Sequence, residues 1–208
     1  MINDSFTDVV LNRASVKVFD ETVKIPREEM LEIINQTAKA PSSVNLQPWR
    51  FVIVESEEGK NILRPLVRKN IRQNDTSAAM IVIFGDLRSY ENAETIYSRA
   101  VEKGYMTPEF KAEKMAFFMP KYENATPREI ADKALLDSSL AAMQLMLVAR
   151  AHGYDTNAIG GFEKDQIAQA LGLDPERYLP VLIVAIGKAN YQPHDTVRLA
   201  AEEITTFK

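Results

Sequence analysis

The sequence contains no cysteine and only two histidines, His152 and His194. Disulfides, thiolate nucleophiles, iron–sulfur clusters and cysteine-ligated zinc are therefore excluded. The two histidines lie far apart in the sequence and have no pattern of neighbouring metal ligands, so we expect no metal site. Any redox chemistry must come from a bound cofactor.

The sequence also lacks a large charge excess and a long apolar run. Its formal net charge is -4 and its pI is near 5.4, which removes the electrostatic reason to bind nucleic acid or anionic lipid. The first residues show no signal-peptide pattern, and no run approaches the roughly 18 apolar residues of a membrane span. We expect a cytoplasmic protein with neither nucleic acid nor a membrane as its partner.

No break in composition divides the 208 residues, so a single domain over 1–208 is predicted. Apolar periodicity and turn residues predict an alternation of helices and buried strands. The helices are expected at 26–39, 57–66, 127–152 and 163–171, and the strands at 51–54, 79–84 and 181–186. The charged and aromatic region 88–122, with helices near 90–103 and 108–118, is expected to leave the core as an excursion. The pattern indicates a mixed α/β protein, with strand order left open.

The predicted helix 127–152 is unusually apolar. Thr126 and Glu129 have the spacing of a capping box, with Pro127 between them at the first helical position. Between Ala134 and Val148 the only charged residue is Asp137. A helix that is apolar on nearly every side needs cover on nearly every side, so a subunit interface is expected there.

Arg13, Ser15 and Lys17 alternate along the N-terminal segment. In an extended chain their side chains point to one side and present two cations and a hydroxyl. This set suits a phosphate group, although a solvated strand edge is an equally simple interpretation.

The segment Pro41-Ser-Ser-Val-Asn-Leu-Gln-Pro48 is a polar loop ahead of a buried strand. Its amides and hydroxyls can donate and accept hydrogen bonds, as the pyrimidine edge of a flavin or a base requires. A turn that satisfies its own polar groups is the simpler alternative. A serine hydrolase built on Ser42 or Ser43 is a third, but no Gly-x-Ser-x-Gly elbow surrounds them.

A second candidate ligand contact is the turn Ile159-Gly160-Gly161, where bare backbone could approach a ligand closely. An ordinary strand-to-helix turn explains it equally well. A Gly-x-Gly-x-x-Gly fingerprint and a Walker A loop are absent, which disfavours a Rossmann dehydrogenase. The aromatic residues of the excursion could line a cleft for a flat substrate or simply anchor a helix. The candidates for this cleft are Phe117, Phe118 and Tyr122.

Together, Arg-Ala-Ser-Val-Lys-Val-Phe at 13–19, the loop 40–49, Ile-Gly-Gly-Phe at 159–162 and Arg198 resemble the FMN-dependent nitroreductase family. The resemblance implies an α+β fold, a three-layer α/β/α sandwich with a mainly antiparallel central sheet, and an intertwined homodimer. It also implies FMN at the subunit interface, reduced by NADH or NADPH at N5 and reoxidised by a nitroaromatic, quinone or similar small-molecule acceptor in a ping-pong reaction. No side chain would be the catalyst, because the flavin carries the chemistry. A flavin-binding sensor or store without turnover is the alternative.

The resemblance also assigns roles to individual residues. Arg13 and Arg198 would hold the phosphate with Ser15, and Lys17 would lie at the N1/O2 edge of the flavin. The loop would come from the other subunit, and Gly160 and Gly161 would offer backbone N–H groups to N5. The complete implied cofactor-binding set is Arg13, Ala14, Ser15, Lys17, Pro41, Ser42, Ser43, Asn45, Gln47, Asn70, Gln73, Ile159, Gly160, Gly161 and Arg198.

Two departures from the family pattern affect this set. Gly160 stands where some members have an acidic residue, and Thr196 stands where some have a lysine. The phosphate site therefore has one cation fewer, and substrate range and flavin potential cannot be carried over from those members.

Overall fold

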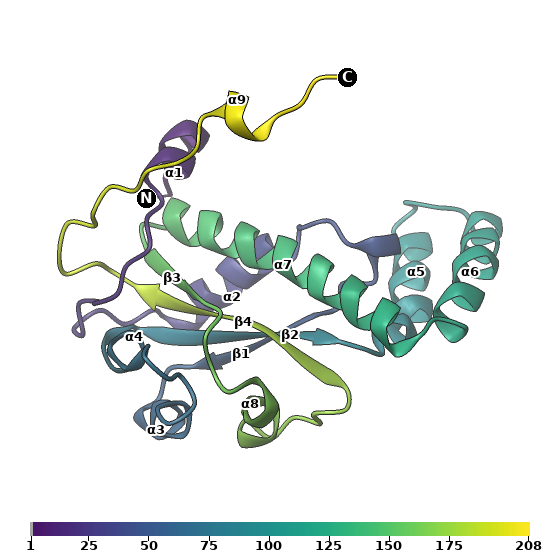
Figure 1. Ribbon diagram of the computed structural model, residues 1–208. Helices are drawn as coiled ribbons and strands as arrows, with labels where there is room; N and C mark the ends of the chain where they lie inside the picture. Colours follow the sequence, from purple (N-terminus) through teal and green to yellow (C-terminus); the bar gives the residue numbers. More distant parts are fainter. Residues whose placement is uncertain (1) are drawn as a thin grey trace.

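A computed structural model describes residues 2–208 (Figure 1). Within that range the sheet has four strands in the order β1-β2-β4-β3, and every neighbouring pair is antiparallel. The strands are β1 Trp49–Val54, β2 Ala79–Asp86, β3 Asp155–Ile159 and β4 Tyr178–Gly187. Ile81 of β2 pairs with Val184 of β4 at the centre, and a register shift follows between Ile83 and Phe84.

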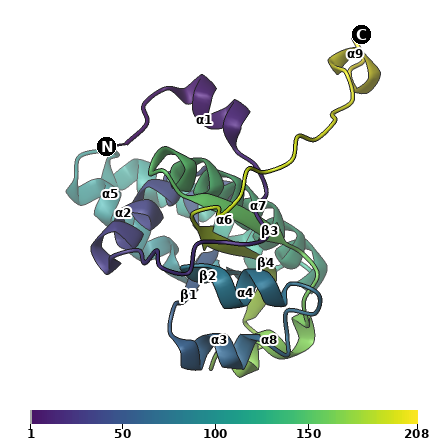
Figure 2. The same cartoon turned by 90° about the vertical axis from the view of Figure 1, so that its left-hand side faces the viewer.

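The helices cover both faces of this sheet. Their bounds are α1 Phe6–Asn12, α2 Arg27–Thr37, α3 Glu57–Leu63, α4 Ile71–Thr76, α5 Ala93–Glu102, α6 Pro108–Glu123, α7 Pro127–Ala151, α8 Lys164–Ala170 and α9 Ala201–Ile204, with 3₁₀ turns η1 Ser43–Asn45 and η2 Ser89–Asn92. Helices α2 and α7 lie on one face, and α3, α4 and α8 on the other (Figures 1 and 2).

Two apolar clusters hold the layers together. Ile33 of α2 and Leu145 of α7 pack on Ile81 and its neighbours, while Leu63 and Ile167 pack on the opposite face. Strand β2 is buried along its whole length because both its faces are covered. The chain therefore has an α+β fold with three layers around an antiparallel sheet, which agrees with the predicted fold class.

Helix α7 crosses the sheet and contacts all four strands. The predicted capping box is present: the Thr126 side chain accepts from the Glu129 N–H, and Glu129 accepts from the Thr126 N–H. By length and composition α7 could cross a membrane, contrary to the expectation from the sequence, but 44% of its apolar window is buried within the chain. It is a core helix, and its remaining apolar face, with Leu136 61% exposed, has no cover within residues 2–208.

Four elements were missed in the sequence: α1, α4, β3 and α9. Strand β3 has no apolar alternation, since Thr156 and Asn157 are consecutive buried polar residues. It forms because β4 offers it a complete hydrogen-bonding edge. Helix α1 is capped by Ser5 and packs against α7 with Val9 buried, whereas its apolar residues Phe6 and Leu11 are exposed.

The C-terminal tail leaves the body of the molecule in both views (Figures 1 and 2). It carries apolar side chains that its own chain does not cover, such as Val197 at 95% exposed and Phe207 at 94%. Exposed apolar groups at this density are typical of a surface that another molecule covers.

Candidate functional site

A cavity of about 760 Å³ lies between the N-terminal segment, the end of α7 and the base of the tail. Arg13 and Arg198, from opposite ends of the sequence, both line it with Ser15. The complete lining is Leu11, Asn12, Arg13, Ala14, Ser15, Arg150, Asp155, Ala189, Tyr191, Gln192, Pro193, His194, Asp195, Thr196 and Arg198. The fold thus brings together the two arginines that the family resemblance assigns to a phosphate.

An ion pair that the sequence did not reveal fixes the base of this cavity. Arg150 at the end of α7 pairs with Asp155 of β3 at 2.9 Å, and the other carboxylate oxygen of Asp155 accepts from the Ala189 N–H at 2.9 Å. Asp155 therefore joins α7, β3 and the start of the tail. The only signal in the sequence was a pair of opposite charges on either side of a glycine turn, which is too common to be informative.

Arg13 has extended dihedrals and Ser15 forms an isolated β-bridge with Thr156, but the chain bends at Lys17. The Val16 N–H donates to the Thr156 carbonyl at 3.0 Å and the Val16 side chain is fully buried, so Ser15 and Lys17 face outward. Lys17 does not line the cavity, and its backbone N–H donates to the Tyr191 hydroxyl at 3.1 Å. Its place at a flavin edge stays a prediction.

Helix α4 links the N-terminal segment to the glycine turn. At one end the Thr76 hydroxyl accepts from the Phe19 N–H at 3.0 Å, and at the other the Asn70 side-chain amide donates to the Gly161 carbonyl at 3.0 Å. Six residues of helix span about 9 Å, so these predicted segments lie close together. The Asn70 amide also donates to Val67 and accepts from Gln73, so it is engaged by the protein itself. Contacts of Asn70 and Gln73 with a ligand stay predictions.

The glycines at 160 and 161 are not required by the chain itself. Neither has a positive φ, and a Cβ at either position would meet no atom within 4 Å. Ile159, which precedes them, is buried at the end of β3. Neither glycine is therefore needed for a positive φ. The space beside both residues leaves room for a ligand or a second chain to approach the backbone closely.

The polar loop that includes η1 is strained. Val44, Asn45 and Gln47 have φ of 44°, 57° and 50°, a left-handed region that non-glycine residues rarely adopt. Each such residue costs of order 1–3 kcal/mol, and a β-branched residue such as Val44 is an outlier there. Strain of this kind persists only when surrounding contacts impose it.

Those contacts come from several elements. Asp137 of α7 accepts from the Ser43 N–H at 2.9 Å and from its hydroxyl at 3.1 Å. The Tyr97 hydroxyl donates to the Val44 carbonyl at 3.0 Å. The Ser42 hydroxyl accepts from the Gln47 N–H at 3.1 Å, so part of the loop satisfies itself, as the simpler alternative proposed.

The loop contacts the middle of α7, whereas the cavity lies at its C-terminal end. Asp137 binds the loop, and Arg150, which is 13 positions further along the helix, lines the cavity. At about 1.5 Å per residue the two are separated by about 20 Å. One chain therefore brings together Arg13, Ser15 and Arg198, and separately Asn70 and Gly161, but it does not bring Pro41, Ser42 or Asn45 to either group.

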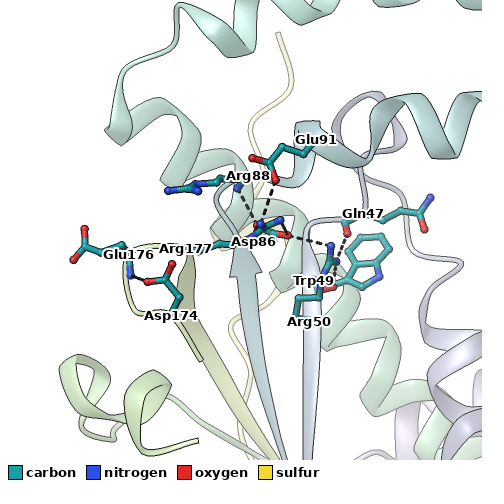
Figure 3. Close-up of polar contacts among 9 residues, drawn as sticks. All are labelled: Gln47, Trp49, Arg50, Asp86, Arg88, Glu91, Asp174, Glu176 and Arg177. Carbon is teal, nitrogen blue, oxygen red and sulfur yellow. Dashed lines mark hydrogen bonds and ion pairs between the residues drawn. The ribbon is translucent and has the colours of Figure 1, made fainter. Parts of the chain in front are cut away.

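A buried carboxylate at the end of β2 also supports the loop (Figure 3). Asp86 is fully buried and accepts from Arg177 at 2.9 and 3.0 Å, from Arg50 at 3.1 Å and from the Arg88 N–H at 2.9 Å. The hydrogen bonds to Asp86 raise the pKa of the Arg177 guanidinium above its usual value. Arg50 in turn donates to the Gln47 carbonyl at 3.1 Å, so Asp86 fixes the end of the strained loop.

The aromatic residues of the excursion separate into two roles. Phe118 and Tyr122 are buried beside Tyr97 and Leu46, and this burial raises the pKa of the Tyr122 hydroxyl. Their packing favours the anchoring role over a place in a substrate cleft. Phe117 is 65% exposed, with the Lys121 ammonium 3.5 Å from its ring centre, and can still face a substrate.

Neither serine of the loop has a histidine partner in residues 2–208. His152 is buried against Glu29 at 3.5 Å, and Ser43 bonds to Asp137 instead. The arrangement of a serine hydrolase is therefore absent from this part of the chain. In the same range no group of three His, Cys, Asp or Glu side chains could hold a metal ion.

Comparison with known proteins defines the class and the family. Residues 10–188 match the sequence model of the Nitroreductase family. A Staphylococcus epidermidis structure, provisionally named an NAD(P)H:FMN oxidoreductase, has a TM-score of 0.98 and 51% identity, covering 100% of this chain and 98% of that one. A provisionally named nitroreductase from Exiguobacterium sibiricum, solved in complex with FMN, has a TM-score of 0.97 and 47% identity, covering 100% and 99%. The CLA biosynthesis enone reductase of Lactiplantibacillus plantarum is 42% identical over 208 residues, which is 100% of this chain and 96% of that protein.

The fold and these matches define an oxidoreductase. The chain belongs to the nitroreductase family, which confirms the family predicted from its motifs.

Proposed function

We propose that this chain is an NAD(P)H-dependent FMN oxidoreductase whose working form is a cytoplasmic homodimer, each subunit a single domain over 1–208. The observation that carries the proposal is the cavity in which Arg13, Ser15 and Arg198 meet although two of them are almost the whole chain apart. The FMN in the Exiguobacterium relative and the name of the Staphylococcus relative support the choice of cofactor.

The residues present fit the phosphate end of FMN. Two guanidiniums and a hydroxyl form a donor set suited to a phosphate dianion, and guanidinium–phosphate bonds are among the stronger hydrogen bonds in proteins. Arg198 has no ion pair within residues 2–208 and donates only to Thr196 and Val197. Its charge is therefore available to a ligand.

The residues also fit the flavin ring. The open backbone at Gly160 and Gly161 allows close approach, and Asn70 holds this turn in place through the Gly161 carbonyl. The polar loop would complete the site from a second copy, because within one chain it lies about 20 Å along α7 from the cavity. A two-fold interface over the exposed apolar face of α7 would bring each loop to the other subunit's cavity and would also give the apolar tail a partner.

FMN, when bound, supplies the hydride chemistry, with NADH or NADPH as the reductant and a conjugated acceptor as the oxidant in a ping-pong reaction. The chain's own residues bind the phosphate, fix the orientation of the ring and exclude water. Acceptors of this kind include nitroaromatics and quinones, and the enone reductase among the relatives adds conjugated enones.

The test is an anaerobic titration of the purified protein. We expect a yellow protein with one FMN per subunit, whose flavin absorbance bleaches on addition of NADH or NADPH and returns when an enone, quinone or nitroaromatic is added. FMN bound without bleaching by either nucleotide would support a sensor or store. A colourless protein that does not take up FMN would refute the proposal.

A further inference from the structure

Asp137 is the one charged residue in the apolar stretch of α7 between Ala134 and Val148. Its side chain is buried, at 4% exposed, and both of its carboxylate oxygens accept from Ser43. Within residues 2–208 it has no ion pair with a basic side chain. The polar contacts of this carboxylate are therefore made with the loop.

Keeping a charge at this place is unfavourable for folding. Burial raises the pKa of the Asp137 carboxyl, although the two bonds from Ser43 and the field of Lys133 act in the opposite direction. An acid whose pKa is higher in the folded than in the unfolded chain favours folding in its protonated form, so its ionised form lowers stability at neutral pH. The gain from the two bonds to Ser43 is therefore set against the cost of burying the charge, and stability alone does not explain the carboxylate.

The strained loop explains why a carboxylate lies at position 137. Val44, Asn45 and Gln47 are held at positive φ, and such a conformation relaxes unless it is fixed from outside. Tyr97 and Arg50 fix the carbonyls of Val44 and Gln47, and Asp137 fixes both the backbone and the side chain of Ser43 at the start of η1. Hydrogen bonds to an ionised acceptor are roughly twice as strong as neutral ones, so an ionised Asp137 holds Ser43 more firmly than a neutral acceptor would.

We infer that Asp137 is a positioning residue for the flavin site: its carboxylate holds Ser43 and thereby keeps the loop 41–47 in the conformation that binds the FMN of the second copy. The inference rests on the proposed function, because it assigns a role to a residue that supports the loop. Asp137 itself need not touch the cofactor. It acts by preorganising a loop that would otherwise lose conformational freedom on binding.

The experiment measures FMN affinity and the stability of the FMN-free protein in Asp137→Ala, Asp137→Asn, Ser43→Ala and the double variant Ser43→Ala/Asp137→Ala. FMN affinity is followed by the recovery of flavin fluorescence on release. We expect Asp137→Ala to weaken FMN binding about tenfold or more, because it removes two bonds to a charged acceptor. Asp137→Asn keeps an acceptor oxygen and should show a smaller loss. Asp132→Ala is the matched control, since Asp132 is an exposed carboxylate on the same helix and should leave the affinity unchanged.

The double variant separates positioning from general damage. If Asp137 acts through Ser43, adding Ser43→Ala to Asp137→Ala should reduce FMN affinity much less than Ser43→Ala does in the wild type. The urea midpoint of the FMN-free Asp137→Ala protein should change little, since removal of the buried charge offsets the two lost bonds from Ser43. FMN affinity equal to that of the wild type, additive effects in the double variant, or a lowered midpoint with proportionate loss of FMN would each overturn the inference. Failure of the wild type to bind FMN would refute the proposed function along with it.

Discussion

Replacing Asp86 by alanine should remove more stability than any surface charge substitution in this chain. The carboxylate is fully buried and receives three bonds from guanidiniums and one from a backbone N–H (Figure 3). Breaking a buried pair by removal of one partner costs about 3–5 kcal/mol. The Arg50 and Arg177 side chains are 36% and 25% exposed, so water can solvate them after the substitution. We therefore expect a loss of about 3 kcal/mol, at the low end of that range.

The assay is urea unfolding of the FMN-free protein at one fixed protein concentration, because association with a second copy would shift the midpoint by mass action. Glu91→Ala is the matched control: Glu91 reaches the same Arg177 at 3.2 Å but is 46% exposed, so its loss should cost below about 1 kcal/mol. Asp86→Asn should fall between the two, since it keeps the shape and one acceptor. A loss below about 1 kcal/mol for Asp86→Ala, or equal losses for both alanine variants, would refute the reasoning.

Three further predictions concern other regions. Burial and a hydrogen bond to a carboxylate raise the pKa of Tyr154 to about 12, so the fold should lose roughly 2–3 kcal/mol of stability as the pH rises from about 10 to 12. Tyr154→Phe should abolish this loss in alkaline unfolding curves, and the same pH dependence in the variant and the wild type would contradict the shift. Arg198→Ala should weaken FMN retention about tenfold or more, whereas Lys208→Ala on the same tail should not, and equal retention would show that the tail does not reach the phosphate. Leu136→Glu on the exposed face of α7 should yield monomers without FMN in sedimentation experiments, while Ile62→Glu on α3 should remain dimeric; a dimeric Leu136 variant would place the interface elsewhere.

What the sequence determined by itself was local. The capping box at Thr126, the buried strand at 79–84 and the alternation of Arg13, Ser15 and Lys17 each depend on residues within a few positions of one another. Helix caps, apolar runs and the two-residue period of an extended chain follow from such neighbours, so these features and the family motifs were recognisable without a structure.

The tertiary structure alone decided how those local pieces combine. Strand β3 forms because β4 supplies the missing hydrogen bonds, and Asp137 finds Ser43 across 94 positions of sequence. The cavity unites Arg13 with Arg198 at the C-terminal end of α7, while the loop contacts the middle of that helix. The order of the motifs along the sequence did not reveal this separation. The physical reason is that a buried polar group must be satisfied by whatever the fold brings beside it, and burial is a property of the whole packed chain rather than of any segment.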